Sequence, residues 1–177
     1  MNKTRVTLVA GMILAATAAR FIPHPPNFTP IAAIALFGGA QFSSRGKAFV
    51  IPLAAMLLGD LIIGLHPLIP FVYGSFALTV CLGIWLRQNR TTARTLVAAL
   101  MGSIQFFVVT NFAVWALLDS YPKNAAGLAA CYIAAIPYFQ NTVLGDLFYS
   151  AVLFGGLAFA EARFAKLRET RNAVQHA

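Results

Sequence analysis

Residues 20–42, RFIPHPPNFTPIAAIALFGGAQF, determine how the rest of this chain is arranged. The first half holds four prolines with a histidine and an asparagine among them, and the second half, after Pro30, is a short apolar run. Proline restricts the backbone, so the first half reads as a rigid connection that presents polar groups at defined positions. Whether the second half crosses a membrane determines the side on which every later connection lies.

The composition indicates an integral membrane protein. Of the 177 residues, 59% are hydrophobic and 10% are charged, whereas a soluble domain has about 25% charged residues. So few charged side chains cannot cover the surface of a small soluble protein, and most of that surface must therefore face lipid. The net charge of +8 does not indicate nucleic-acid binding, because the basic residues lie at the ends of apolar runs, as topology determinants do.

The apolar segments predict an all-α bundle of six transmembrane helices in one domain, residues 1–177. A spanning helix needs about 20 apolar residues, with a range of about 17–25. The predicted spans are about 5–22, 30–42, 47–65, 69–87, 94–117 and 141–163. The first span has the charge pattern of a signal peptide, but a proline-rich stretch and further spans follow it, so we interpret it as a retained helix.

One more apolar segment, residues 126–139, does not fit the pattern of a span. It is short and Pro137 interrupts it. We therefore expect residues 118–140 to form an external, lid-like segment.

The basic residues predict the orientation of the helices. Lys and Arg collect in cytoplasmic connections near helix ends. If 30–42 crosses and 126–139 does not, eleven of the thirteen basic residues are cytoplasmic, and only Arg20 and Lys123 are external. Both termini are then cytoplasmic, and we expect a multi-pass protein of the bacterial inner membrane.

Polar side chains gather at the predicted external end. The external connections and their flanks contain His24, Asn27, His66 and Gln140, and the outer parts of the helices contain Asp60, Asn111, Trp115 and Asp146. A carboxylate at bilayer depth costs roughly 2.5–3.5 kcal/mol on insertion scales, so it usually faces the bundle interior or a water-filled cavity. The pattern predicts a site open to the outside. Each carboxylate alone is equally well explained by bonds to a helix end, and His24 by an exposed loop.

Small residues follow one face of the first helix. Gly11, Ala15 and Ala19 recur at a spacing of four, and such residues let helices approach closely in lipid. The stripe predicts either close packing inside the bundle or docking of a partner membrane protein.

Motifs of the common enzyme classes are missing. The sequence has no glycine-rich phosphate loop, no H-E-x-x-H metal motif and no nucleophile elbow. A membrane enzyme or metal-handling protein that uses the external Asp and His residues is an alternative function, and a structural subunit without a ligand is a third. Cys81 and Cys131 lie far apart in apolar surroundings, so neither a disulfide nor a zinc site is expected.

Several stretches carry a resemblance to known families. The predicted arrangement, with six helices, a short second helix and an external site, resembles the substrate-binding S components of energy-coupling-factor (ECF) vitamin transporters. A family of small uncharacterised bacterial membrane proteins is similar over about residues 20–154, in PHPPNFTPIAAIALFGGAQF, LAAMLLGDLIIGLH, FVYGSFAL, TNFAVW and AAIPYFQNTVLGDLFY.

The most similar S components are the solitary cobalamin transporters of the BtuM type. This resemblance implies binding positions at His24, Asp60 and Tyr73. Those transporters place a cobalt-binding cysteine where residues 61–73 have none, and an arginine where this chain has Gln140. Cobalamin is therefore one candidate ligand, and no cofactor or metal site is assigned.

The resemblance also implies a function. It implies a subunit that captures a vitamin or related small cofactor from outside, with the small-residue stripe contacting an ECF-type coupling protein that works with ATPases. The predicted ligand-binding residues are His24, Asn27, Asp60, His66, Tyr73, Asn111, Trp115, Gln140 and Asp146.

Overall fold

The described part of the chain is a bundle of six α-helices, which confirms the predicted all-α class. The computed structural model describes residues 3–88 and 90–168. The helices are α1 (Lys3–Ala18), α2 (Ile31–Gln41), α3 (Arg45–Ile63), α4 (Ile69–Gln88), α5 (Thr92–Leu117) and α6 (Ala125–Arg163), and single 3-10 turns follow α1 and α6 at Ala19–Phe21 and Ala165–Leu167.

Five of these helices are long and apolar enough to cross a membrane, and α2 is the shorter one. Their outer surfaces are covered with large apolar side chains, of which Ile62 is 72% exposed and Phe159 is 76% exposed. A soluble protein does not expose apolar surface on this scale. The chain is a multi-pass membrane protein embedded in a lipid bilayer.

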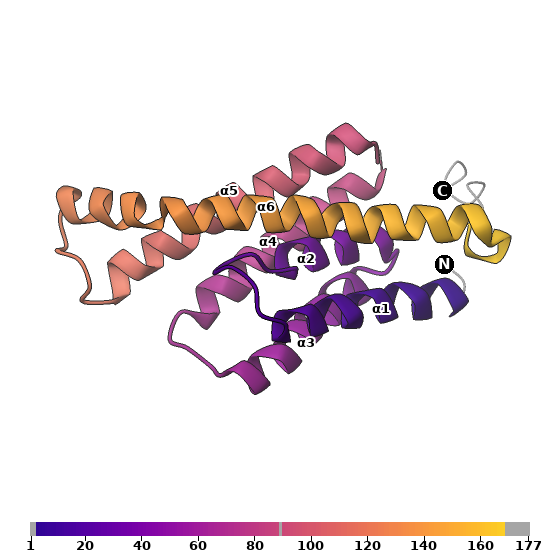
Figure 1. Ribbon diagram of the computed structural model, residues 1–177, viewed down its shortest axis with the longest axis horizontal. Coiled ribbons are helices and arrows are strands. Elements are labelled where there is room, and N and C mark those ends of the chain that lie inside the picture. Colours follow the sequence, from indigo (N-terminus) through magenta and orange to yellow (C-terminus); the bar gives the residue numbers. More distant parts are fainter. Residues whose placement is uncertain (1–2, 89, 169–177) are drawn as a thin grey trace.

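Helix α2 is the centre of the bundle. All of its residues are buried, and it packs against every other helix (Figure 1). A helix that is apolar all round is stable only when other helices surround it. At about 1.5 Å per residue it is about 16 Å long, which is roughly half the hydrocarbon thickness of a bilayer. Residues 22–30 lead the chain from the end of the bundle to the buried start of this helix.

Two glycines let α2 and α4 pack backbone against backbone. A Cβ atom on Gly39 would collide with the carbonyl oxygen of Val80, and a Cβ atom on Gly83 would collide with the carbonyl oxygen of Leu36. Only glycine fits at either position, because the atom it would strike is backbone and cannot rotate away. This contact fixes the depth of α2 within the bundle.

The last helix differs from the prediction. The expected external segment 118–140 is not a separate lid, because Ala125–Gln140 forms the first part of α6, which runs without a break through Pro137. Proline removes one backbone hydrogen bond, a loss that membrane helices tolerate. With 39 residues, α6 is about 58 Å long. Together with α5 it projects beyond the other helices (Figure 1).

The connections separate into two ends. Helix α1 begins and α6 ends at one end, here called the terminus end, which also holds residues 42–44 and the α4–α5 connection (Figure 1). The opposite end, here called the rim end, holds the connections 22–30, 64–68 and 118–124. The arrangement agrees with an even number of crossings, whereas the side of the membrane on which each end lies stays a prediction.

A buried ion pair ties the helices together at the terminus end. Arg5 of α1 is 3% exposed and donates to Glu161 of α6 at 2.7 Å and to Gln41 of α2 at 2.9 Å. Burial of such a pair is tolerated only when hydrogen bonds satisfy both charges. Both α1 and α6 are thereby fastened to the central helix.

Candidate functional site

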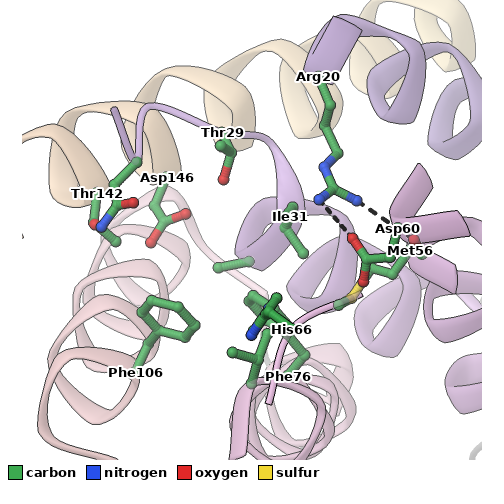
Figure 2. A pocket seen from close by; sticks show the side chains of 13 residues that line it. Arg20, Thr29, Ile31, Met56, Asp60, His66, Phe76, Phe106, Thr142 and Asp146 are labelled. Carbon is green, nitrogen blue, oxygen red and sulfur yellow. Dashed lines mark hydrogen bonds and ion pairs between the residues drawn. The ribbon is translucent and has the colours of Figure 1, made fainter. Parts of the chain in front are cut away.

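A cavity of about 290 Å³ lies toward the rim end, where α3 ends and α4 begins (Figure 2). Its lining combines polar groups from several parts of the chain with an apolar wall. The polar lining residues are Arg20, Asn27, Thr29, Asp60, His66, Thr142 and Asp146, and the apolar ones are Ile31, Ala32, Met56, Val72, Phe76 and Phe106. This combination is typical of small-molecule sites.

The proline-rich connection 22–30 forms one wall of the cavity and is held against α6. Asn141 donates from Nδ2 to the carbonyl oxygen of Pro26 at 2.9 Å, and the ring of Phe28 packs against Phe148 and Tyr149. Gly145 allows this approach, because a Cβ atom there would lie 3.1 Å from the backbone nitrogen of Thr29. The connection is therefore a fixed wall.

Asn27 sits at the turn of this wall with a φ of +64°. Asparagine tolerates this left-handed conformation better than most residues. Its side chain lines the cavity, so the strained position also places a hydrogen-bonding amide at the site.

The carboxylate of Asp60 is neutralised by Arg20, one of the two basic residues predicted to be external. Arg20 donates from Nη2 to Asp60 Oδ1 at 2.7 Å, and the hydroxyl of Tyr73 donates to Asp60 Oδ2 at 2.7 Å. Both oxygens of the Asp60 carboxylate thus have donors. Gly59 makes room for the guanidinium, since a Cβ atom there would lie 2.6 Å from Arg20 Nη1. The contact explains why a cation lies at the rim end.

Asp146 faces the same cavity in a different electrostatic setting. It is 3% exposed, and Ser103 donates from Oγ to its Oδ2 at 2.6 Å. Among residues 3–88 and 90–168 no other hydrogen bond or ion pair of Asp146 is found. Figure 2 shows Asp146 on the side of the cavity opposite the Arg20–Asp60 pair.

A second cavity, of about 260 Å³, adjoins the first toward the α5–α6 hairpin. Three residues, Asn27, Phe106 and Thr142, line both cavities. The two cavities are therefore neighbours that share a wall. Asn111 lines the second cavity and donates from Nδ2 to the carbonyl oxygen of Phe107 at 2.8 Å.

The structure brings together most of the predicted ligand-binding residues. Asn27, Asp60, His66 and Asp146 line the first cavity, and Asn111 lines the second. Tyr73 lies beside the first cavity and acts through its bond to Asp60.

Besides Tyr73, three predicted residues do not line either cavity. The ring nitrogen Nδ1 of His24 lies 3.0 Å from the carbonyl oxygen of Pro25, and Gln140 is exposed on α6. Trp115 donates from Nε1 to the carbonyl oxygen of Pro122 at 2.9 Å and so fastens the tip of the α5–α6 hairpin.

Sequence reasoning missed several residues that the cavity uses. The sequence contained a signal for Arg20, because it is one of only two basic residues predicted outside. A cation at the same depth as the carboxylate of Asp60 is expected to pair with that carboxylate. Ser103, Thr29 and Thr142 carried no signal, since single hydroxyl residues are common in membrane helices.

The small-residue stripe lies on the outer surface of α1. Gly11 and Ala15 are exposed and Ala19 is partly exposed, and no atom lies within 4 Å of a Cβ atom built on Gly11. The stripe therefore does not serve internal packing.

The Cys, His and acidic side chains do not form a metal site in the described part of the chain. Among the residues that the structure describes, no three His, Cys, Asp or Glu side chains are grouped to hold a metal ion. Cys81 is exposed and Cys131 is buried, and neither lines a cavity.

Comparison with known proteins identifies the family. No curated protein and no solved structure matches the chain. The profile of one family, described as a family of unknown function (DUF6580), matches residues 1–168, and the chain, a multi-helix membrane protein, therefore belongs to the DUF6580 family.

Proposed function

We propose that this protein is a membrane-embedded binding subunit that captures a small organic molecule at its rim end for uptake into the cell. The observation that carries the proposal is the first cavity, in which polar groups from α3, α6, the turn after α1 and two connections converge on an apolar interior. A few placed polar groups in an apolar pocket orient a small ligand, while burial of its apolar surface supplies affinity.

The size of the cavities favours a small ligand. Pockets for drug-sized molecules have volumes of about 300–1,000 Å³, and the two adjoining cavities measure about 290 and 260 Å³. A molecule as large as cobalamin would need the connection 22–30 to move away from α6. The cavity volumes therefore favour the smaller vitamins and cofactors as ligands.

Transport through an ECF-type arrangement is consistent with the outer surface of α1. The exposed stripe of Gly11, Ala15 and Ala19 offers a smooth face on which a coupling protein can pack closely. In this proposal an associated module with ATPases supplies the energy, and the binding subunit reorients to release its ligand in the cytoplasm.

The first experiment is native mass spectrometry of the full-length protein extracted in mild detergent, with an absorbance spectrum and metal analysis. A co-purifying small organic molecule supports the proposal, and a corrinoid spectrum would identify cobalamin. A tightly held metal without an organic molecule would instead support the metal-handling alternative.

A cavity-filling variant makes this test specific. Ala32 lines the cavity on α2, so Ala32→Leu should remove bound ligand while every polar group stays in place. Ala54→Leu is the matched control, because Ala54 is exposed on α3. Retention of the same ligand by Ala32→Leu would place the binding elsewhere and overturn the proposal. If neither variant nor wild type holds a ligand, thermal-shift screening of a vitamin and cofactor library decides, and a screen without a hit overturns it.

A further inference from the structure

The charges around the first cavity do not balance. The guanidinium of Arg20 and the carboxylate of Asp60 neutralise each other at 2.7 Å, and Tyr73 completes the coordination of Asp60. The remaining acid in the lining is Asp146, and no Lys or Arg other than Arg20 lines the cavity within the described parts of the chain. The cavity therefore contains one acid without a basic partner.

The position of Asp146 makes this imbalance costly. Its side chain is buried, with 3% of the residue exposed, and only Oδ2 receives a hydrogen bond, from Ser103. A buried carboxylate without a counter-charge is strongly unfavourable. A bound ligand that brings a positive charge to Oδ1 would remove that cost, whereas a ligand with a negative charge would add to it.

The surroundings of Asp146 suit an organic cation. Phe106 lies on the same side of the cavity (Figure 2), and its ring stacks on Phe76 with centroids 5.2 Å apart. Aromatic rings attract a desolvated ammonium group through their faces. A hydrated metal ion would need several oxygen ligands, and the described residues group no such set here.

We infer that the ligand of this cavity is a small organic cation whose protonated amine or related cationic nitrogen pairs with Asp146. The inference rests on the proposed binding function and adds the chemical class of the ligand. Asn27, Thr29 and His66 remain for the polar groups of the molecule. His66 is the other titratable side chain in the lining without an ion-pair partner among the described residues.

The test compares three probes of nearly equal shape on the full-length protein in an uncharged detergent at neutral pH. The probes are 2-phenylethylamine, the neutral 2-phenylethanol and the anion 3-phenylpropanoate, and calorimetry and thermal stability report their binding. We expect the amine to bind about 30-fold more tightly than the alcohol, a preference near the low end of the range for close charge pairs, and the anion not to bind.

Variants assign the preference to Asp146. Asp146→Asn should lower the affinity for the amine to that for the alcohol, and Asp119→Asn, at an exposed acid on the hairpin tip, should leave it unchanged. If Asp146→Asn does not fold, the amine-to-alcohol ratio in the wild-type protein still decides. Equal binding of amine and alcohol, or an unchanged preference in Asp146→Asn, would overturn the inference. Failure of the amine to bind would overturn it too, whereas a library hit of another chemistry would leave the proposed function standing.

Discussion

Arg20 Nη2 lies 2.7 Å from Asp60 Oδ1, and each side chain of the pair is about nine-tenths buried, with 10% and 9% exposed. Forty positions separate the two residues along the chain, so the contact fastens the turn after α1 to the last part of α3. The hydroxyl of Tyr73 extends the contact to α4. Asp60 is therefore part of the framework of the site, and a variant at this position changes stability as well as binding.

Breaking this pair from one side should be worse than removing both charges. Arg20→Gln leaves the Asp60 carboxylate buried without its cation, and we expect a loss of about 3–5 kcal/mol of stability. The double variant Arg20→Gln/Asp60→Asn should recover most of that loss, because no uncompensated charge remains. Thermal unfolding in detergent measures both. Equal stability of the single and double variants would show that the pair is not coupled.

Removing the charge of Asp146 should stabilise the protein, whereas removing the charge of Arg20 should destabilise it. In the absence of ligand its carboxylate has Ser103 as its hydrogen-bond partner and no cation among the described residues. Asp146→Asn keeps an acceptor for Ser103 and removes the buried charge, so the empty protein should be stabilised by about 1 kcal/mol or more. Differential scanning fluorimetry checks this without any ligand. A large destabilisation would mean that Asp146 serves the fold.

The contact between α2 and α4 should tolerate no added atom at Gly83. Gly83→Ala forces the two backbones apart, and we expect a loss of about 1–3 kcal/mol, the range for overpacked cores. Gly74→Ala is the control on the same helix, because nothing lies within 4 Å of the added Cβ atom. That variant should be neutral or gain about 0.5–1 kcal/mol from the higher helix propensity of alanine. Similar melting temperatures for the two variants would contradict the close contact.

Trp115 should stabilise the tip of the α5–α6 hairpin and leave ligand binding unaffected. Its indole donates to Pro122, and Lys123 donates from Nζ to the carbonyl oxygens of Trp115 and Leu118. Trp115→Phe removes one hydrogen bond worth about 1 kcal/mol, so cleavage by trypsin after Lys123 should become about fivefold faster. Trp85→Phe, at an exposed position on α4, is the control. Loss of ligand binding in Trp115→Phe would show that Trp115 contributes to the ligand-binding site, as the sequence predicted.

The sequence was sufficient to predict the helices, because each long apolar run needs a helix in lipid and its ends are marked by basic residues or proline. It failed at residues 126–139. A proline in a short apolar segment usually ends a helix in water, whereas in this protein the helix continues through Pro137 into α6. Length rules alone cannot distinguish these cases, since they do not include the support that α5 gives to α6 along the hairpin.

The site was predictable in its position and only partly in its contacts. Polar residues at one depth predicted a cavity, and Asn27, Asp60 and His66 do line one. The rotation of each helix about its axis decides whether a polar side chain faces the cavity or, as Trp115 does, donates a hydrogen bond to a neighbouring backbone carbonyl. For α2 and α4 the close contact at Gly39 and Gly83 constrains this rotation, and sequence spacing does not reveal that contact.

The two basic residues at the rim end now have structural reasons for their position. Arg20 neutralises Asp60, and Lys123 binds carbonyl oxygens at the end of α5. Because contacts within the protein explain the position of Arg20 and Lys123, these two residues do not contradict the rule that Lys and Arg collect on the cytoplasmic side. The remaining basic residues that the structure describes lie at or near the terminus end of the bundle. This distribution predicts that the terminus end is cytoplasmic and that the cavity opens to the outside.

Cysteine labelling in intact cells tests this orientation. Ser120 and Ser44 are both exposed, the first on the hairpin tip at the rim end and the second between α2 and α3 at the terminus end. In a background with Cys81→Ser and Cys131→Ser, a membrane-impermeant maleimide should label Ser120→Cys and should reach Ser44→Cys only after the cells are permeabilised. The reverse pattern would place the cavity on the cytoplasmic side. A binding subunit for uptake could then not capture its ligand from outside, and a role in export or in sensing a cytoplasmic molecule would replace it.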